Sequence, residues 1–145
     1  MLLNTRIEEL IGESMKSGNA KRTGTLRLIK AAFLNYTKQN SKNKLDEAAE
    51  IDILKKLAKQ REESIAIYRA NNREDLVSSE EAELNIIKEF LPAEVSEEEI
   101  EKRATEIIVV KEKSKMGEYI KQLKQEFPGA NGKTVANVVM KIING

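Results

Sequence analysis

The sequence predicts an all-α protein with an N-terminal helical domain of about four helices and a small C-terminal domain of three. Apolar residues recur every three or four positions along nearly the whole chain, which is the helical period. Leu, Ile, Ala, Lys and Glu dominate the composition, while aromatic residues make up only 4%. At 145 residues the chain is long enough to bury a core.

The first two helices of the N-terminal domain, which we expect over residues 1–92, are predicted from their apolar stripes. Thr5-x-x-Glu8 predicts a capping box for the first helix, and Gly18-Asn19 predicts its end. The polar run 40–44 predicts the end of the second. The two stripes consist of Leu3, Ile7, Leu10, Ile11 and Met15, and of Leu26, Ile29, Phe33 and Tyr36.

The third and fourth helices follow from the same pattern. Asp46 is a predicted N-cap of the third helix, and Asn71-Asn72 interrupts the pattern. The fourth helix should end before Pro92, because the residue preceding a proline disfavours helical geometry. The stripes are Ile51, Leu54, Ala58, Ile65 and Tyr68 in the third, and Leu76, Glu80, Leu84, Ile87 and Leu91 in the fourth.

The stretch 92–96 is the predicted domain boundary, and the C-terminal domain is expected over residues 93–145. Ser96-x-x-Glu99 predicts a capping box, and the acids Glu97–Glu99 suit the positive end of a helix dipole. Three short helices should follow. Their apolar positions are Ile100, Ala104, Ile107 and Ile108; Met116, Ile120, Leu123 and Phe127; and Val135, Val138, Val139 and Ile142.

The composition excludes several classes of chemistry. Cysteine and histidine are both absent, so no disulfide, Cys/His zinc site, cysteine nucleophile or histidine base is possible. We therefore predict no catalytic residue, no metal and no cofactor. The acids Glu62, Glu63, Glu80, Glu81 and Glu83 are interpreted as solvated surface. No apolar run approaches the ~20 residues of a membrane span, and the N-terminus lacks a signal-peptide pattern. A soluble, cytoplasmic protein without a membrane partner is expected.

The net charge of +1 conceals strong segregation along the chain. Residues 14–45 hold eight basic residues and no acid, residues 46–101 hold seventeen acidic and seven basic residues, and residues 102–145 hold nine basic and four acidic ones. Arg22, Arg27 and Lys30 are predicted to lie near one helix face. That face is either solvated surface or a strip that follows phosphates, and the two interpretations are equally supported.

Gly132-Lys133-Thr134 matches the end of a nucleotide phosphate loop. Such a loop also needs a glycine at position 127, where Phe127 stands, and a preceding strand, where the pattern is helical. We instead expect Pro128-Gly129 to end one helix and Asn131 or Gly132 to begin the next, with the glycines supplying unusual φ values. The backbone N–H groups of Lys133 and Thr134 should then be free to bind an anion, such as a nucleic-acid phosphate.

Three segments together resemble the GatB/YqeY family along essentially the whole chain: "LRLIKAAFLN" (Leu26–Asn35), "EFLPAEVSEEEIE" (Glu89–Glu101) and "MGEYIKQLKQEFPGANGKTVANVVMKII" (Met116–Ile143). The resemblance implies a free-standing YqeY-like protein, similar to the tail of the GatB component of the tRNA-dependent amidotransferase. That enzyme is a carbon–nitrogen ligase that amidates Glu-tRNA(Gln) or Asp-tRNA(Asn) with glutamine as amido donor. Its tail grips the tRNA body, and its chemistry lies in other domains.

The family pattern falls on Met116, Gly117, Gly129, Gly132, Lys133 and Val135 of this sequence. The sequence departs from it at Glu118, where relatives often have Lys, at Asn131, where Asp is frequent, and at Ala136, where Asn is common.

The resemblance and the charge blocks predict a tRNA-binding module that is not catalytic by itself, with tRNA or a tRNA-charging or amidating enzyme as partner. The alternative is a protein–protein interaction adaptor that does not bind RNA. A ligase acting alone is disfavoured, because no ATP-binding signature and no amidase serine motif is present. The candidate RNA-binding residues are Lys115, Lys121, Lys124, Gly129, Gly132, Lys133 and Thr134, together with Lys21, Arg22, Arg27 and Lys30.

Overall fold

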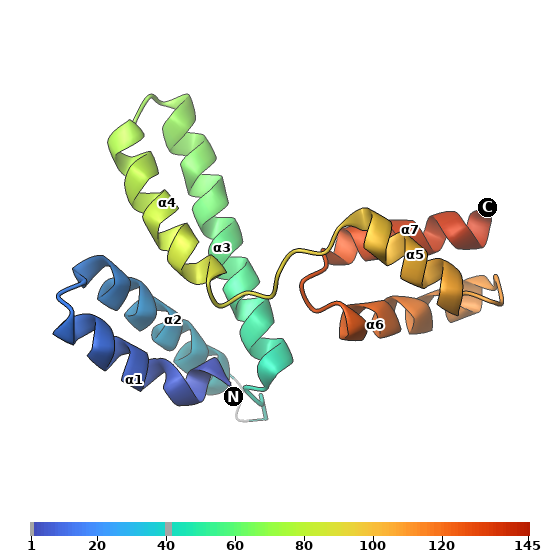
Figure 1. Ribbon diagram of the computed structural model, residues 1–145, viewed down its shortest axis with the longest axis horizontal. Coiled ribbons are helices and arrows are strands. Elements are labelled where there is room, and N and C mark those ends of the chain that lie inside the picture. The colour runs from blue at the N-terminus through green and yellow to red at the C-terminus, as the bar shows by residue number, and fades with distance from the viewer. Residues whose placement is uncertain (1, 40–41) are drawn as a thin grey trace. The chain divides into compact units, whose positions relative to one another are not determined.

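The computed structural model describes residues 2–39 and 42–145, and in these ranges it contains seven α-helices, one short 3-10 turn and no strand (Figure 1). The predicted all-α fold class is confirmed. The chain divides into two compact units, Met1–Leu91 (unit 1) and Pro92–Gly145 (unit 2). Each unit has an apolar core of its own.

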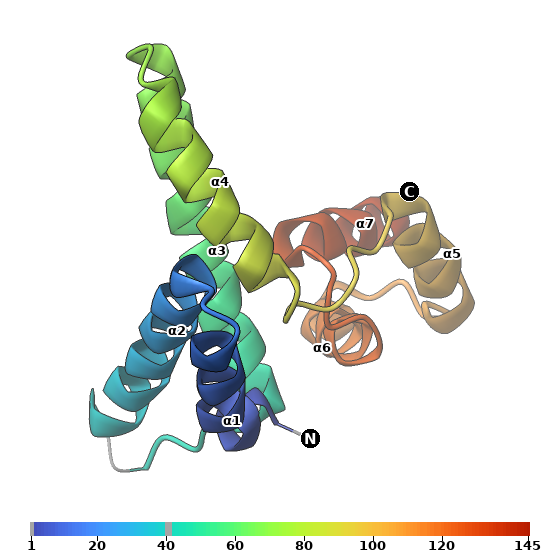
Figure 2. The same ribbon diagram turned by 60° about the vertical axis from the view of Figure 1, so that its left-hand side comes forward.

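Unit 1 consists of two helical hairpins (Figures 1 and 2). The first pairs α1 (Leu3–Lys16) with α2 (Ala20–Gln39), and the second pairs α3 (Glu47–Ala70) with α4 (Glu74–Lys88). The end of the α3–α4 hairpin projects beyond the α1–α2 hairpin. The apolar stripes meet between the hairpins, where the most deeply buried side chains are Ile7, Leu26, Ile29, Phe33, Leu54, Val77 and Ile87.

Most helix ends in unit 1 follow local sequence signals. Asp46 caps α3 by accepting a hydrogen bond from the Ala49 N–H at 2.8 Å, as predicted. Gly18 takes a left-handed φ of 72° after α1, and Asn72 takes a φ of 56° between α3 and α4. The α4 helix ends at Lys88, before Pro92 as predicted. One detail differs from the prediction: Met15 is 56% exposed although it continues the α1 stripe.

The predicted Thr5–Glu8 capping box is wrong. The N-cap of α1 is Leu2, whose side chain makes no cap hydrogen bond. Instead the buried carboxylate of Glu50, on α3, accepts hydrogen bonds from the backbone N–H groups of Leu3 at 3.0 Å and Asn4 at 2.7 Å. A negative charge at the positive end of a helix dipole is favourable. The α1 helix is therefore capped by a residue 46 positions away from Asn4.

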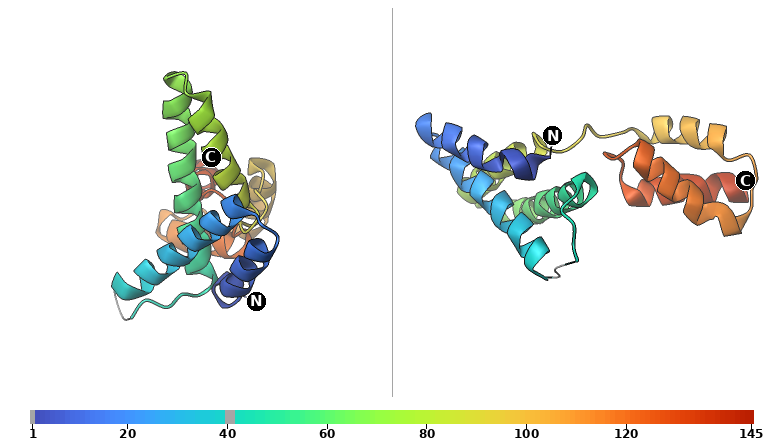
Figure 3. Two further views of the ribbon diagram at one scale, coloured as in Figure 1. Left: turned by 90° about the vertical axis from the view of Figure 1, so that its left-hand side faces the viewer. Right: turned by 90° about the horizontal axis from the view of Figure 1, so that it is seen from below.

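Unit 2 packs three helices around a second core: α5 (Glu97–Ile107), α6 (Met116–Glu126), which follows the 3-10 turn η1 (Lys113–Lys115), and α7 (Gly132–Asn144) (Figure 3). Ser96 caps α5 by accepting a hydrogen bond from the Glu99 N–H at 3.2 Å, as predicted. The fully buried side chains of this core are Ile100, Ala104, Leu123, Val135, Val138 and Val139.

Neither Gly129 nor Gly132 has an unusual φ, which corrects the expectation for this turn, and Gly129 is needed for packing instead. Gly18 is the glycine with positive φ in the described chain, so Gly129 and Gly132 have ordinary backbone angles. A Cβ on Gly129 would overlap the carbonyl oxygen of Ala93, whereas a Cβ on Gly132 would meet only the flexible end of Lys124. Gly129 therefore lets the α6–α7 turn lie directly against the backbone at the start of unit 2.

Candidate nucleic-acid interface

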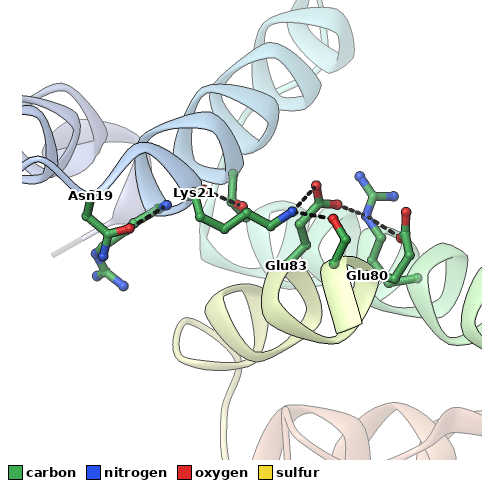
Figure 4. Close-up of polar contacts among 8 residues, drawn as sticks. Asn19, Lys21, Glu80 and Glu83 are labelled. Carbon is green, nitrogen blue, oxygen red and sulfur yellow. Dashed lines mark hydrogen bonds and ion pairs between the residues drawn. The ribbon is translucent and has the colours of Figure 1, made fainter. Parts of the chain in front are cut away.

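Lys21, a candidate RNA-binding residue of unit 1, is part of an ion-pair network that joins three helices (Figure 4). Its ammonium group donates to the Ser79 hydroxyl at 2.7 Å and lies 3.3 Å from a Glu83 carboxylate oxygen of α4. Arg61 of α3, only 14% exposed, binds the other oxygen of Glu83 at 2.9 Å and lies 3.7 Å from Glu80. Glu80 and Glu83 are thus half-buried partners of cations, and their interpretation as solvated surface was wrong.

The remaining basic candidates of unit 1 contact different elements. Arg22 pairs with Glu89 after α4 and lies over the Phe90 ring, 5.8 Å from its centroid. Lys30 pairs with Glu8 of α1. Arg27 is exposed, and its guanidinium contacts the Met15 sulfur at 3.6 Å. Three of the four basic candidates of unit 1, Lys21, Arg22 and Lys30, therefore form ion pairs with acidic residues of the same unit.

The start of α7 is closed by Asn131, one of the positions that depart from the family pattern. Its side-chain oxygen accepts hydrogen bonds from the N–H groups of Lys133 at 2.9 Å and Thr134 at 3.4 Å. The expectation that these N–H groups are free was therefore wrong, because an asparagine at the N-cap supplies its own acceptor. An anion at this turn would be held by side chains instead.

Lys124 brings a second positive charge to this turn. Its Cε and Nζ atoms lie 3.2 and 3.3 Å from the point where a Cβ on Gly132 would stand, so the side chain crosses the first residue of α7. Lys121 lies one turn earlier on the same flank of α6, and Lys133 is exposed on the first turn of α7. We call Lys121, Lys124 and Lys133 the basic face; none of the three has an ion pair with another residue in the described ranges.

The ion pairs between described residues of unit 2 all involve α5. Arg103 of α5 donates to Glu106 and to Glu126 of α6, both at 2.9 Å, and these hydrogen bonds, that to Glu126 foremost, raise the pKa of Arg103. Lys141 of α7 lies 3.7 Å from Glu101 of α5. The α5 helix itself carries Glu97, Glu98, Glu99, Glu101 and Glu106. Most acids of unit 2 therefore lie on α5, whereas the three lysines of the basic face lie on α6 and α7.

The other candidates of unit 2 have separate positions. Lys115 is exposed at the start of α6, nine residues before Lys124 and thus about 13 Å along the helix axis. Gly129 is a packing residue, and Thr134 is half-buried with its N–H bound to Asn131. The sequence reasoning missed the capping role of Asn131, which the Asn-x-x pattern before an apolar stripe could have indicated.

Metal-binding clusters and membrane-spanning helices are both absent from the residues that the structure describes. Residues 2–39 and 42–145 contain no group of three or more carboxylate, Cys or His side chains arranged to hold a metal ion. No helix in the same ranges is long and apolar enough to cross a lipid bilayer.

Comparison with known proteins gives a consistent family. The model of the family described as "Yqey-like protein" matches residues 4–143. A Kluyveromyces lactis protein, "Altered inheritance of mitochondria protein 41, mitochondrial", is 31% identical over 132 residues, 89% of this chain and 69% of that protein. Proteins of the same name match from Candida glabrata, 30% identical over 80% of this chain and 59% of its own length, and from Lachancea thermotolerans, 40% identical over 48% and 37%.

These names correct the cytoplasmic location expected from composition: the relatives are named as mitochondrial proteins, and the expectation was wrong. The physical reason is that receptors read a targeting segment, whereas a charged, helix-rich composition is common to folded domains of many compartments. Because the family model spans residues 4–143 of the 145, the chain belongs to the YqeY-like protein family.

Proposed function

We propose that this chain is a tRNA-binding module, related to the tail of the tRNA-dependent amidotransferase and without catalytic activity of its own. The observation that carries the proposal is the basic face, where the exposed residues Lys121, Lys124 and Lys133 of α6 and α7 have no acidic partners among the described residues. Two other cations of the same unit, Arg103 and Lys141, pair with acids of α5 and α6, whereas the lysines of the basic face have no such partner among the described residues.

The electrostatics of the α7 start favour an anionic ligand. A helix N-terminus carries partial positive charge, and a lysine ammonium beside it is unfavourable by a few tenths of a kcal/mol to about 1 kcal/mol. Lys124 stands in that position, and Lys133 adds a second charge on the next residue. A phosphate group would offset this repulsion. Since Asn131 occupies the backbone donors, the contacts would come from lysine side chains, which bind phosphates as point charges.

The test is a titration of labelled tRNA with the full chain at low and moderate salt. Lys133→Glu and Lys124→Glu should each weaken binding about tenfold at low salt and reduce the slope of log K against log salt by about 1. Glu118→Lys should strengthen binding, because Glu118 lies one turn before Lys121 on α6 and has no ion pair among the described residues. Arg27→Glu, in unit 1, tests the remaining exposed candidate.

Lys102→Glu is the matched control. Lys102 is an exposed lysine of unit 2 on α5, the acidic side, so the same change of charge should leave tRNA affinity within about twofold. Absence of binding at low salt, or tight binding that salt does not weaken, would contradict the proposal. So would an equal loss of affinity in Lys102→Glu and Lys133→Glu.

A protein–protein adaptor is the second candidate, and exposed apolar residues of α2 favour it. Leu28 is 37% exposed and Leu34 46% exposed on the outward side of this helix. An adaptor would retain a protein partner after nuclease treatment and lose it in Leu28→Ser or Leu34→Ser, with tRNA affinity absent. Glutamine-dependent amidation by the purified chain would contradict the non-catalytic part of the proposal.

A further inference from the structure

We infer that the basic face selects double-stranded RNA over single-stranded RNA and is insensitive to base sequence. This inference rests on the proposed function and adds the class of nucleic acid that the site takes. It depends on the groups that surround the three lysines, and above all on the side chains that single-stranded RNA would need.

Single-stranded RNA is held by stacking of its bases on exposed aromatic rings, each worth about 1–3 kcal/mol. The chain has three Phe, three Tyr and no Trp. None of these six rings belongs to an exposed residue: Phe33 is buried, and Tyr36, Tyr68, Phe90, Tyr119 and Phe127 are half-buried. The few aromatic rings of the chain are therefore also too buried to serve as stacking surfaces for bases.

The two aromatic residues of unit 2, Tyr119 and Phe127, both pack against its core. The Tyr119 hydroxyl donates to the carbonyl oxygen of Val110 at 3.0 Å, and its ring packs against the core. Phe127 packs against the same core directly after α6. Their rings therefore cannot open a stacking surface without breaking packing contacts of the unit.

Arginine is the other side chain on which bases stack, and unit 2 has a single one. Arg103 lies on α5 and is bound to both Glu106 and Glu126. The basic face itself is made only of lysines, which are compact point charges without a planar group. It can therefore contact phosphates but has no planar cation or aromatic ring on which a base stacks.

A duplex suits such a face for a physical reason. Its two strands present a rigid, dense array of phosphates, so binding releases more counterions and costs little ordering of the ligand. A single strand must lose conformational freedom on binding, and without stacking nothing offsets that loss. Recognition of the duplex by backbone and shape also explains why its sequence should not matter.

The experiment compares a short RNA duplex with an unstructured, uridine-rich single strand that has the same number of phosphates. Both compete for the full chain against labelled tRNA at one low salt concentration. We expect the duplex to bind at least about tenfold more tightly, and duplexes of different sequence to agree within about threefold. Lys124→Gln with Lys133→Gln should lower duplex affinity, while Lys102→Gln should not.

A gain-of-function variant tests the cause. Asn137 is exposed one turn after Lys133 on α7, so Asn137→Tyr places a ring beside the basic face. This variant should raise single-strand affinity about fivefold or more and leave duplex affinity unchanged.

Three results would overturn the inference or its basis. Equal or tighter binding of the single strand, with tRNA binding intact, would overturn duplex selection and leave the proposed function standing. An Asn137→Tyr variant that folds but gains no single-strand affinity would overturn the explanation by missing stacking. Failure of every RNA to bind would overturn the proposed function itself.

Discussion

Basic side chains have different surroundings in the two units of this protein. In unit 1, Lys21, Arg22, Lys30 and Arg61 pair with carboxylates of other elements and so connect its helices. In unit 2, the lysines of the basic face have no such partners in the described chain. The difference teaches that a run of charge along the sequence does not identify a charged surface. Residues 14–45 carry eight cations and no acid, yet Lys21, Arg22 and Lys30 of this segment pair with acids from other parts of the fold.

The largest expected loss of stability is at Gly129. A substitution there disrupts the packing of unit 2 without changing any of its lysines. Gly129→Ala forces a Cβ into the Ala93 carbonyl oxygen and should lower the free energy of unfolding of unit 2 by about 3 kcal/mol. Amide hydrogen exchange, resolved by peptide, should show faster exchange in α5–α7 and unchanged exchange in α1–α4. Affinity for tRNA should fall with it.

Gly132→Ala is the matched control for that change. Its new Cβ would meet only Cε and Nζ of Lys124, which can move, so the stability of unit 2 should change by less than about 0.5 kcal/mol. Equal destabilisation by the two substitutions would show that the turn depends on glycine for a reason other than the contact with Ala93.

The next largest effect is at Arg61, the central cation of unit 1. Arg61→Ala leaves Glu80 and Glu83 facing each other with only Lys21 nearby, and should cost about 2 kcal/mol of stability. Urea unfolding followed by circular dichroism measures the loss, and tRNA affinity of the folded protein should stay within about twofold. A variant as stable as the original chain would show that this network contributes nothing to the hairpin packing.

Local signals explain why much of the fold could be predicted from the sequence. Asp46 and Ser96 cap their helices within three residues, and the apolar period identifies the buried faces. The cap of α1 by Glu50 could not be predicted, because it depends on how α3 packs against α1. At the candidate site, the position of Lys133 and Thr134 in the first turn of the last helix was predicted, but the pairing of Lys21 and Lys30 was not, since their partners are distant in sequence.

A smaller change in stability, and of opposite sign, is expected at Lys124. It is the most direct test of the difference between the cations of the two units. Removing a paired cation from unit 1 destabilises it, whereas Lys124→Gln removes an unpaired cation from the positive end of α7. Unit 2 should become more stable by roughly 0.5 kcal/mol at low salt, and the gain should vanish at high salt. Chemical denaturation at two salt concentrations measures this. A loss of stability at low salt would mean that Lys124 has a structural role like the cations of unit 1.

The smallest effect concerns an ion pair of unit 1 that is fully exposed, between Arg73 and Asp75 at the start of α4. Its geometry, 3.2 Å between Arg73 Nη2 and Asp75 Oδ2, resembles that of the structural pairs, but water surrounds both groups. The hydrogen bond from Arg73 lowers the pKa of Asp75. A carboxyl with a lowered pKa stabilises the fold above its ordinary pKa, and that contribution is lost as pH falls through the lowered value. Arg73→Gln should therefore raise the pKa of Asp75 toward its ordinary value in an NMR titration, without a measurable change in unfolding at neutral pH, because solvent screens the pair. A clear loss of stability in Arg73→Gln would instead show that this exposed pair stabilises unit 1 as the pairs of Lys21 and Arg61 do. Burial would then not explain which ion pairs of unit 1 contribute to its stability.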